Sequence, residues 1–598
     1  MAARIDTAKQ SRGKVMRIYT WPIVLFLIIS GGSATKMTVD CNGGGDFAEI
    51  QSAINTATDG DEILVGDGLY RENLVVNRSI TLKGDGNATV EGLEVDLPVI
   101  NITSENVTLE SLIITNATAT ADESSFGAIQ VSSDGCRLLN NTICNSSAHG
   151  ILLTSSGDHR ISGNHIYGIG KSGICAIRSD NNNIVDNKIH NIGEDGIFID
   201  TCIYNTISHN AMYNISECGV DAHNLRKSEI YQNEIYSIGE DGVCLEGSWN
   251  NVLLENRIYE NENDGITLFN TSNNNYLGLN SVIGCGVYGV LAIDSSDDNV
   301  VVSNTLSNNG LSGIGIYGSK SSTILRNDVF DNYNNGISVR ENSDNNEIKE
   351  NRVHGNVRDG LRIEACSNNL LFMNVIYENR NGVDMDDSSD STLIENEIYD
   401  NSLGVILEFS ENVVLAENEL YNNSFGAVQY NHCNESKISR NDIHDNEDDG
   451  IHLADSCFII ISDNAIWNNS EFGIQLLDSS NQNTIMLNVI RNCGKGGIYA
   501  YEGDSNKYVG NFLIENKEFN AMDNGKSILW LGNYYSDYQG WDSDGDGFGD
   551  EAYVIYGRRE ASAVDRRPVM SSADPSFRLL LDDRVLSILS VLNSQQTE

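Results

Sequence analysis

A dense run of carboxylates lies near the C-terminal end of the chain. Its odd-numbered positions, from 1 to 9, are Asp542, Asp544, Asp546, Phe548 and Asp550. Carboxylates at this spacing, with glycine at position 6 and a main-chain carbonyl at position 7, form an oxygen cage for a hard cation. Position 12 is Tyr553, where a complete EF-hand loop has glutamate. The spacing predicts a structural calcium site, and an acidic turn without an ion is the alternative.

Ionisable residues also recur at intervals of 22 to 24 residues along the middle of the chain. One set is Asp200, His223 and Glu246, with Asp221 just before His223. The other set is Arg340, Arg362, Glu364, Asp384, Asp386, Glu408 and Tyr430. Groups about 5 Å apart on adjacent strands perturb each other's pKa, which acid–base catalysis requires.

We therefore take Asp221 and His223 as acid and base candidates. The other residues of the two sets are candidate substrate ligands, and Arg340 and Arg362 would suit substrate carboxylates. The alternative interpretation is a solvated face of a very acidic protein, because charged side chains are normally exposed.

The interval belongs to a repeat that covers most of the chain. A glycine followed by a small or branched apolar residue returns seventeen times, with spacings of 22, 23 or 24 residues. An asparagine precedes it by eight or nine residues, as Asn187 precedes Gly196. A fixed period of this length predicts one structural unit copied many times.

Each repeat contains two short strand patterns, N-x-I and a run that begins at the glycine, separated by polar turns. This composition predicts a right-handed parallel β-helix of about 20 coils. The leucine-rich repeat, which has a similar period, lacks support because its L-x-x-L-x-L consensus is absent. Residues one and three after each glycine should point inward, and residues two and four outward. The repeated asparagine predicts an internal amide ladder.

The ends of such a stack need capping. Asp46 as N-cap and Glu49 in a capping box predict a short helix that plugs the N-terminal mouth. Cys433 and Cys457 each lie seven residues after a repeat glycine, which predicts that they stack on adjacent coils. They would form a disulfide or a ladder of two buried thiols.

Several stretches resemble known β-helix families. Residues 44–54, 60–65, 68–72 and 82–84 resemble the opening of secreted β-helix proteins, among them pectin methylesterases and the NosD-like family. The N-x-I and x-G-I units resemble parallel β-helix (PbH1) repeats of the NosD-like, carbohydrate-binding and sugar-hydrolase (CASH) group. Residues 532–568 are similar to the C-terminal module of NosD-like archaeal surface proteins, and the acidic loop resembles those of dockerins and thrombospondin repeats. The resemblance implies the fold more than a reaction, because the group includes enzymes, binding proteins and structural proteins.

A shorter resemblance concerns the catalytic candidates. Asp221-Ala222-His223 resembles the D-P-H-[DE] motif of mannuronan C5-epimerases, although Ala222 replaces proline and Asn224 replaces the acid. The NosD name is linked to copper delivery, but the ten histidines and nine methionines form no tight cluster of soft ligands in the sequence.

Composition limits the partners. A net charge of −47 argues against nucleic acid or an anionic membrane surface, and leaves cations, cationic surfaces or neutral glycans. Basic residues before the apolar run 21–29, and small residues after it, predict a cleavable export signal, with an uncleaved anchor as the alternative. The expected divisions are a signal at 1–34, an N-terminal cap with first coils at 35–115, repeats at 116–528, a calcium-loop module at 529–570 and a tail at 571–598.

Together these patterns predict a secreted or cell-surface β-helix protein without a further membrane span. The first hypothesis is that it binds a polysaccharide or cell-surface glycan, or contributes to the envelope or extracellular matrix, without turnover. A polysaccharide lyase or C5-epimerase acting on uronate polymers is the second hypothesis. A NosD-like periplasmic accessory protein is the third.

Overall fold

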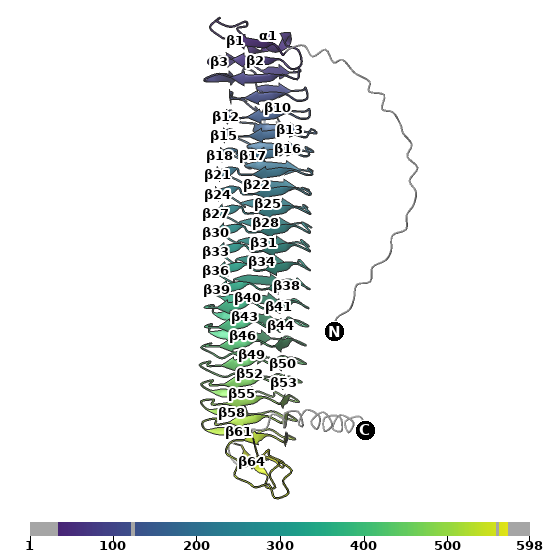
Figure 1. Ribbon diagram of the computed structural model, residues 1–598, viewed down its shortest axis with the longest axis vertical. Coiled ribbons are helices and arrows are strands. Elements are labelled where there is room, and N and C mark those ends of the chain that lie inside the picture. The colour runs from purple at the N-terminus through teal and green to yellow at the C-terminus, as the bar shows by residue number, and fades with distance from the viewer. Residues whose placement is uncertain (1–33, 121–125, 558–560, 572–598) are drawn as a thin grey trace, which may run out of the picture.

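The chain forms one long stack of parallel β-coils (Figure 1). The computed structural model describes residues 34–120, 126–557 and 561–571, so nearly all of the predicted export signal and C-terminal tail lies outside the described residues. The stack has about 22 turns and one helix in the described residues. The predicted parallel β-helix is therefore confirmed.

Each coil consists of three strands separated by polar turns. A representative coil contains β19 (Ile197–Asp200), β20 (Thr206–Ser208) and β21 (Ala211–Ile215). Each strand pairs in parallel with the strand three places further along the chain, so Ile197 lies opposite Val220 on the next coil. Three columns of strands therefore run along the rod, and we call the first of them the glycine column because its strands follow the repeat glycines.

The residues of both ionisable sets lie on strands of the glycine column. Its relevant strands are β19, β22 (Val220–His223), β25 (Val243–Glu246), β37 (Ile337–Arg340), β40 (Asp359–Glu364), β43 (Asn381–Asp386), β46 (Leu403–Glu408), β49 (Val428–Asn431) and β52 (Ile451–Ala454). Alternate apolar residues of these strands are fully buried in the core, as Ile197 and Ile199 are in β19. The residues between them face outward, because successive side chains of a strand point to opposite sides.

The repeat glycine is required by close stacking of the coils. A Cβ atom on Gly196 would lie 2.5 Å from the carbonyl oxygen of Gly219, and one on Gly219 would lie 2.5 Å from that of Gly242. Real Cβ atoms do not approach backbone oxygen so closely. A larger residue at Gly196 or Gly219 would therefore force the adjacent coils apart, which explains why glycine recurs with the period seen in the sequence.

The predicted amide ladder is confirmed. In each step, the Nδ2 of one asparagine donates to the Oδ1 of its copy on the next coil, at 2.9 to 3.1 Å. The members are Asn141, Asn164, Asn187, Asn210, Asn233, Asn256, Asn280, Asn304, Asn327, Asn351, Asn374, Asn396, Asn418, Asn441, Asn464, Asn488, Asn511 and Asn533. Each also donates to a core-side carbonyl, so these buried amides are satisfied without water.

The helix α1 (Ile50–Thr56) lies at the N-terminal end of the stack (Figure 1). The predicted capping by Asp46 and Glu49 is wrong. Asp46 instead accepts hydrogen bonds from Thr38, while Glu49 stands at the N-cap position without a side-chain capping bond. The free N–H groups of the first turn donate to Glu72, at 2.8 and 2.9 Å. A carboxylate distant in sequence thus performs the capping role.

At the other end, the coils give way to an antiparallel pair, β64 (Tyr553–Tyr556) and β65 (Ala561–Asp565). The last ladder asparagine, Asn533, donates its Nδ2–H to the buried carboxylate of Asp565 at 3.0 Å. Asp565 also accepts the N–H groups of Gly532 and Asn533. The amide ladder therefore ends on the side chain of an aspartate.

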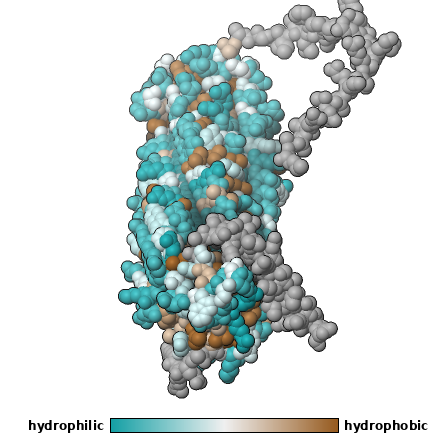
Figure 2. Space-filling view, turned by 60° about the horizontal axis from the view of Figure 1, so that its bottom comes forward, coloured by the Kyte–Doolittle hydropathy of each residue, from teal (hydrophilic) through white to brown (hydrophobic). Residues whose placement is uncertain are grey.

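Hydrophilic residues dominate the surface in Figure 2, with hydrophobic residues gathered in smaller patches between them. Among the described residues, no helix has the length and apolar character needed to cross a bilayer. The fold thus offers long outward faces, and the chemistry of each face depends on which side chains occupy its rows.

Candidate functional site

The first ionisable set forms one outward row on β19, β22 and β25. Asp200 is opposite His223, and His223 is opposite Glu246. His223 Nε2 lies 3.2 Å from Asp221 Oδ2 and 3.4 Å from Glu246 Oε2. Asp200 accepts a hydrogen bond from Thr201 at 2.8 Å. The structure brings these predicted residues together, and we call Asp200, Asp221, His223 and Glu246 the His223 face; their role stays a prediction.

Further acids are buried beside the His223 face. Asp195, Asp241 and Asp264 each precede a repeat glycine, and all three are buried. Burial and the nearby Asp221 raise the pKa of Asp195 to about 8, and burial raises the pKa of Asp264 to about 7. Burial also raises the pKa of Asp221, although His223 opposes this shift. This side of the rod therefore holds carboxyl groups that retain protons near neutral pH.

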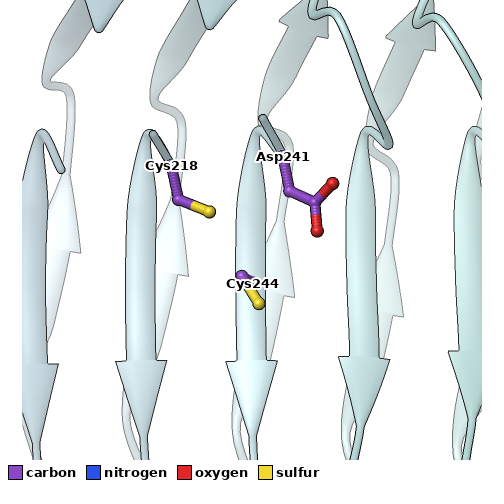
Figure 3. A group of neighbouring side chains, drawn as sticks. All are labelled: Cys218, Asp241 and Cys244. Carbon is purple, nitrogen blue, oxygen red and sulfur yellow. The ribbon is translucent and has the colours of Figure 1, made fainter. Parts of the chain in front are cut away.

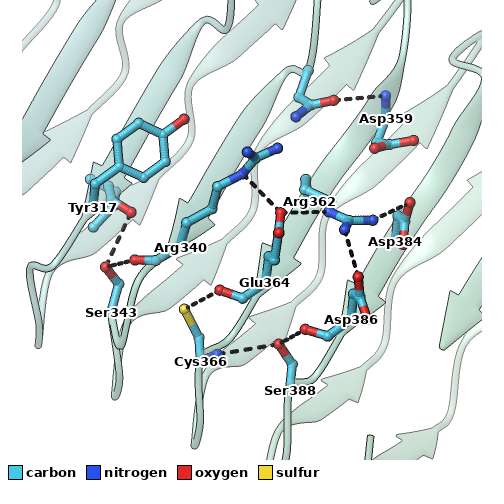
Figure 4. A network of polar contacts seen from close by, with 12 residues as sticks. Tyr317, Arg340, Ser343, Asp359, Arg362, Glu364, Cys366, Asp384, Asp386 and Ser388 are labelled. Carbon is cyan, nitrogen blue, oxygen red and sulfur yellow. Dashed lines mark hydrogen bonds and ion pairs between the residues drawn. The ribbon is translucent and has the colours of Figure 1, made fainter. Parts of the chain in front are cut away.

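The second ionisable set is an ion-pair network around Arg362 (Figure 4). Arg362 Nη1 lies 2.6 Å from Asp384 Oδ2, Nη2 lies 3.1 Å from Asp386 Oδ2, and Nε lies 3.4 Å from Glu364 Oε2. Arg340 Nε lies 3.3 Å from the same Glu364 oxygen. The guanidinium groups expected to receive substrate carboxylates are thus already in contact with carboxylates of the protein.

One member of the second set was placed wrongly. Tyr430 is fully buried and points into the core, and Asn431 takes the outward position, with its Nδ2 donating to Glu408 at 3.2 Å. The cause is that Ala427, and not Gly426, lies in the glycine column and accepts the N–H from β46. A shift of one residue turns every side chain of a strand to the other face.

The same shift separates two cysteines. Cys433 is buried opposite Ser456, whose Oγ accepts its N–H at 3.0 Å. Cys457 is half-buried and pairs through its backbone with Asn434. Both thiols are free. The predicted stacking of Cys433 on Cys457 is wrong, and neither the disulfide nor the ladder of two buried thiols forms.

The acidic loop gathers three of its predicted ligands. Carboxylate oxygens of Asp542, Asp544 and Asp546 lie within 4.8 Å of one another. Backbone N–H groups of the loop donate to Asp542, chiefly that of Gly547 at 2.9 Å, and these bonds lower the pKa of Asp542. A hard cation prefers such ionised oxygen donors.

Asp550 and Phe548, the other two predicted ligands, have contacts of their own. Asp550 accepts the N–H of Ser543 at 2.8 Å, and bonds from Ser543 lower the pKa of Asp550. The guanidinium of Arg567 lies over the ring of Phe548, with its Cζ atom 4.5 Å from the ring centroid. Arg567 also forms an ion pair with Asp546. A basic side chain thus partly balances the charge of the loop.

Two rows of stacked rings lie on the column of strands that carries the N-x-I pattern, and the sequence did not lead us to expect them. Their centroids are 4.1 to 5.4 Å apart and their planes are within 10° of parallel. One row is Tyr167, His190, Tyr213, Tyr236 and Tyr259, and the other is Phe330, His354, Tyr377, Tyr399, Tyr421, His444 and Trp467. The aromatic residue that often follows N-x-I was the available signal. Because the ring faces cover one another, mainly their edges remain for other contacts.

A small pocket was also missed, at the place where the repeat shifts. It has a volume of 260 Å³ and is lined in part by Phe425, Gly426, Gln429, Asp449 and His452. Nδ1 of His452 lies 3.1 Å from Asp449 Oδ2. The signal in the sequence was the pair of unequal spacings around Gly426, 22 before it and 24 after it.

The comparisons with known proteins agree with this architecture. The model of the right-handed β-helix region matches residues 78–224, 126–282 and 277–402, which together exceed half of the chain. A second family model, described as periplasmic copper-binding protein (NosD), matches residues 354–540. A cell surface glycoprotein from Methanothermus fervidus is 34% identical over 135 residues. That match covers 22% of this chain and 22% of the glycoprotein, so the chain spans about a fifth of the length of this relative.

Solved structures match the chain at low identity. The A-module of the Azotobacter vinelandii mannuronan C-5 epimerase AlgE6 is 17% identical, with 57% of this chain and 93% of that chain covered and a TM-score of 0.34. An alginate lyase from Paenibacillus is 16% identical, with 45% and 94% covered and a TM-score of 0.31. From the coils observed and the family model matched, the chain belongs to the right-handed β-helix family.

Proposed function

We propose that this chain is an extracytoplasmic, surface-associated β-helix protein that binds a glycan through the His223 face. The cellular location is supported by the cell surface glycoprotein relative and by the periplasmic description of the NosD family. The predicted export signal is in keeping with the same location.

The observation that carries the binding proposal is the position of His223 between Asp221 and Glu246, at 3.2 and 3.4 Å. Carboxylates accept hydrogen bonds from sugar hydroxyls, and an imidazole can donate or accept. The three side chains are 17 to 34% exposed, so they are fixed by neighbours yet accessible. Polar groups held in a row with a spacing of about 5 Å suit an extended chain of similar units lying along the rod.

Charge selects the class of glycan. The His223 face carries three carboxylates and one imidazole, and the arginines of the second set are paired with Glu364, Asp384 and Asp386. A polyuronate would meet mostly like charge here. Neutral or amino-containing glycans avoid that repulsion, so the proposal is binding of such a glycan.

A second candidate function is a lyase or C5-epimerase activity. Burial raises the pKa of Asp221, which lies beside His223, and this pairing could serve as acid and base. The activity would require a uronate to approach the acidic face, for which bound cations would have to compensate.

Calorimetry with purified full-length chain and a panel of neutral, amino and uronate oligosaccharides tests the binding proposal. Asp221→Asn and Glu246→Gln should each weaken binding at least about tenfold, because each removes a charge-assisted hydrogen bond. Glu229→Gln, an exposed acid on the neighbouring column, is the matched control. Binding that both substitutions leave unchanged would refute the His223 face as the site.

The same panel separates the two functions. Formation of unsaturated products, or exchange of the C5 proton in a uronate polymer, would establish turnover. If Asp221→Asn abolishes that turnover, the second function replaces the first. Binding of a neutral or amino glycan without any turnover supports the first.

We also propose that the acidic loop binds calcium through Asp542, Asp544, Asp546, Asp550 and the carbonyl of Phe548. The proposal is supported by the clustering of three carboxylates and by the ligand spacing. Calorimetry should give one calcium ion per chain, and Asp544→Ala with Asp546→Ala should remove it. Glu551→Ala, which removes an exposed acid that is not a predicted ligand, should leave binding intact. A parent chain that binds no calcium would disprove the site.

A further inference from the structure

Two cysteines and an aspartate meet in the wall of the rod, apart from the candidate sites above. Cys218, Asp241 and Cys244 are all buried, and their ligand atoms lie within 4.8 Å of one another. Figure 3 shows Asp241 and Cys244 on one coil and Cys218 on the coil before it. Both thiols are free.

The stacking of coils fixes the three residues. Cys218 and Asp241 each precede a repeat glycine, and Cys244 stands opposite Asp221 on β25. The N–H of Cys218 donates to Asp195 Oδ1 at 3.1 Å, and Asp241 Oδ1 accepts the N–H of Asp264 at 3.0 Å. These bonds hold the backbone of Cys218 and the side chain of Asp241 in place.

Acidic side chains surround the cluster. Glu240 Oε2 lies 4.0 Å from Cys218 Sγ. Asp195 and Asp241 are buried, and the side chain of Asp221 is only 17% exposed. An ion of charge +2 at this point would favour the ionised form of these acidic side chains, whereas neutral packing of the thiols would not.

We propose that Cys218, Asp241 and Cys244 bind a divalent cation of the zinc class, with Glu240, whose Oε2 lies 4.0 Å from Cys218 Sγ, as the fourth ligand. Two thiolates and a carboxylate suit a borderline-soft ion, whereas calcium and magnesium prefer oxygen alone. Zinc–sulfur and zinc–oxygen bonds of about 2.3 and 2.0 Å place tetrahedral ligands nearly 4 Å apart, which lies within reach of the observed cluster.

The site is separate from the segment that matches the copper-binding NosD family, which begins at residue 354. It also differs from other buried thiols nearby. Cys202 accepts the N–H of Ser179 at 3.2 Å and lies 3.2 Å from the carbonyl oxygen of Asp200, within a column where serine often stands. Cys202 thus has a structural explanation, and Cys202→Ser provides a matched control.

The test uses reduced, chelator-treated full-length chain titrated with Zn²⁺ and, separately, with Co²⁺. One equivalent of either ion should bind in excess calcium, and Co²⁺ should give the near-ultraviolet charge-transfer absorption of thiolate ligands. The acidic loop lacks sulfur and cannot give that absorption. Zn²⁺ should also raise the midpoint of thermal unfolding of the parent chain.

Cys218→Ser and Cys244→Ser should each lower Zn²⁺ affinity by more than about a hundredfold, exceeding the loss typical of an outer-shell partner. Asp241→Asn, which preserves volume, should also weaken Zn²⁺ binding. It tests the site even if either cysteine variant folds poorly. Cys202→Ser should bind as the parent does. Absence of the thiolate absorption in the parent would overturn the proposal. So would a Cys218–Cys244 disulfide that persists under reduction, or equal Zn²⁺ affinity in all variants.

Discussion

At the scale of single residues, Arg362 shows how contacts change the meaning of a sequence position. Its position marks it as outward and suited to an acidic ligand, yet its side chain is only 15% exposed and touches Glu364, Asp384 and Asp386. Burial beside Asp359 raises the pKa of Asp384 to about 6 even with Arg362 in contact. The arginine therefore compensates charge within the wall of the rod.

Removing Arg362 should consequently be costly. Arg362→Met leaves several partly buried carboxylates without their partner, and breaking a buried pair in this way typically costs about 3 to 5 kcal/mol. Arg326→Met, which removes an exposed arginine paired with Glu350 alone, should cost less than about 1 kcal/mol. Thermal and urea unfolding of both variants measure the difference. Equal effects would show that the Arg362 network does not stabilise the fold.

The candidate residues could be located from the sequence only as far as the repeat was regular. Counting from the glycine gave the correct row for Asp200, His223 and Glu246. It failed at Tyr430, because Ala427 and not Gly426 occupies the column position there. Ala427 lies 23 residues after Gly404 and 23 residues before Gly450. The contacts of Arg362 with carboxylates were beyond prediction, because they depend on side-chain rotamers in three dimensions.

At the scale of the structural element, one column of buried asparagines also accommodates a histidine. His159 stands in a column whose next members are Asn182 and Asn205, and its Nδ1 accepts the N–H of Cys136 at 3.2 Å, as Asn182 Oδ1 accepts that of His159. Burial lowers the pKa of His159 to about 4. The buried ring is therefore neutral at pH 7.

This histidine should make the N-terminal coils sensitive to acid. Its pKa rises to about 6.5 on unfolding, so its contribution to stability is complete above pH 6.5 and is lost as the pH falls toward 4. The loss amounts to about 3 kcal/mol. His159→Asn keeps the acceptor and continues the column of asparagines, so it should reduce the fall in unfolding midpoint between pH 7 and pH 4.5. A variant with the parent's pH profile would show that His159 is not the sensor.

At the scale of the whole molecule, the sequence was sufficient for the architecture because every coil repeats one set of local rules. Glycine permits close stacking, asparagine satisfies the turns, and alternate apolar residues fill the core. The ends escaped prediction because they depend on contacts remote in sequence. Glu72 bonds the first turn of α1, and Asp565 receives the last ladder asparagine.

The repetition also multiplies charge along the rod. With a net charge of −47 and coils stacked about 4.8 Å apart, like charges on neighbouring coils repel over distances shorter than the Debye length, about 10 Å at 0.1 M salt. Raising chloride salt from about 20 mM to about 500 mM, where the Debye length falls toward that spacing, should therefore raise the midpoint of thermal unfolding. Choline chloride should act like potassium chloride if screening is the cause, and the Asp544→Ala, Asp546→Ala variant should respond as the parent does. An increase seen only with a metal cation, or lost in that variant, would instead assign the effect to specific ion binding at the acidic loop.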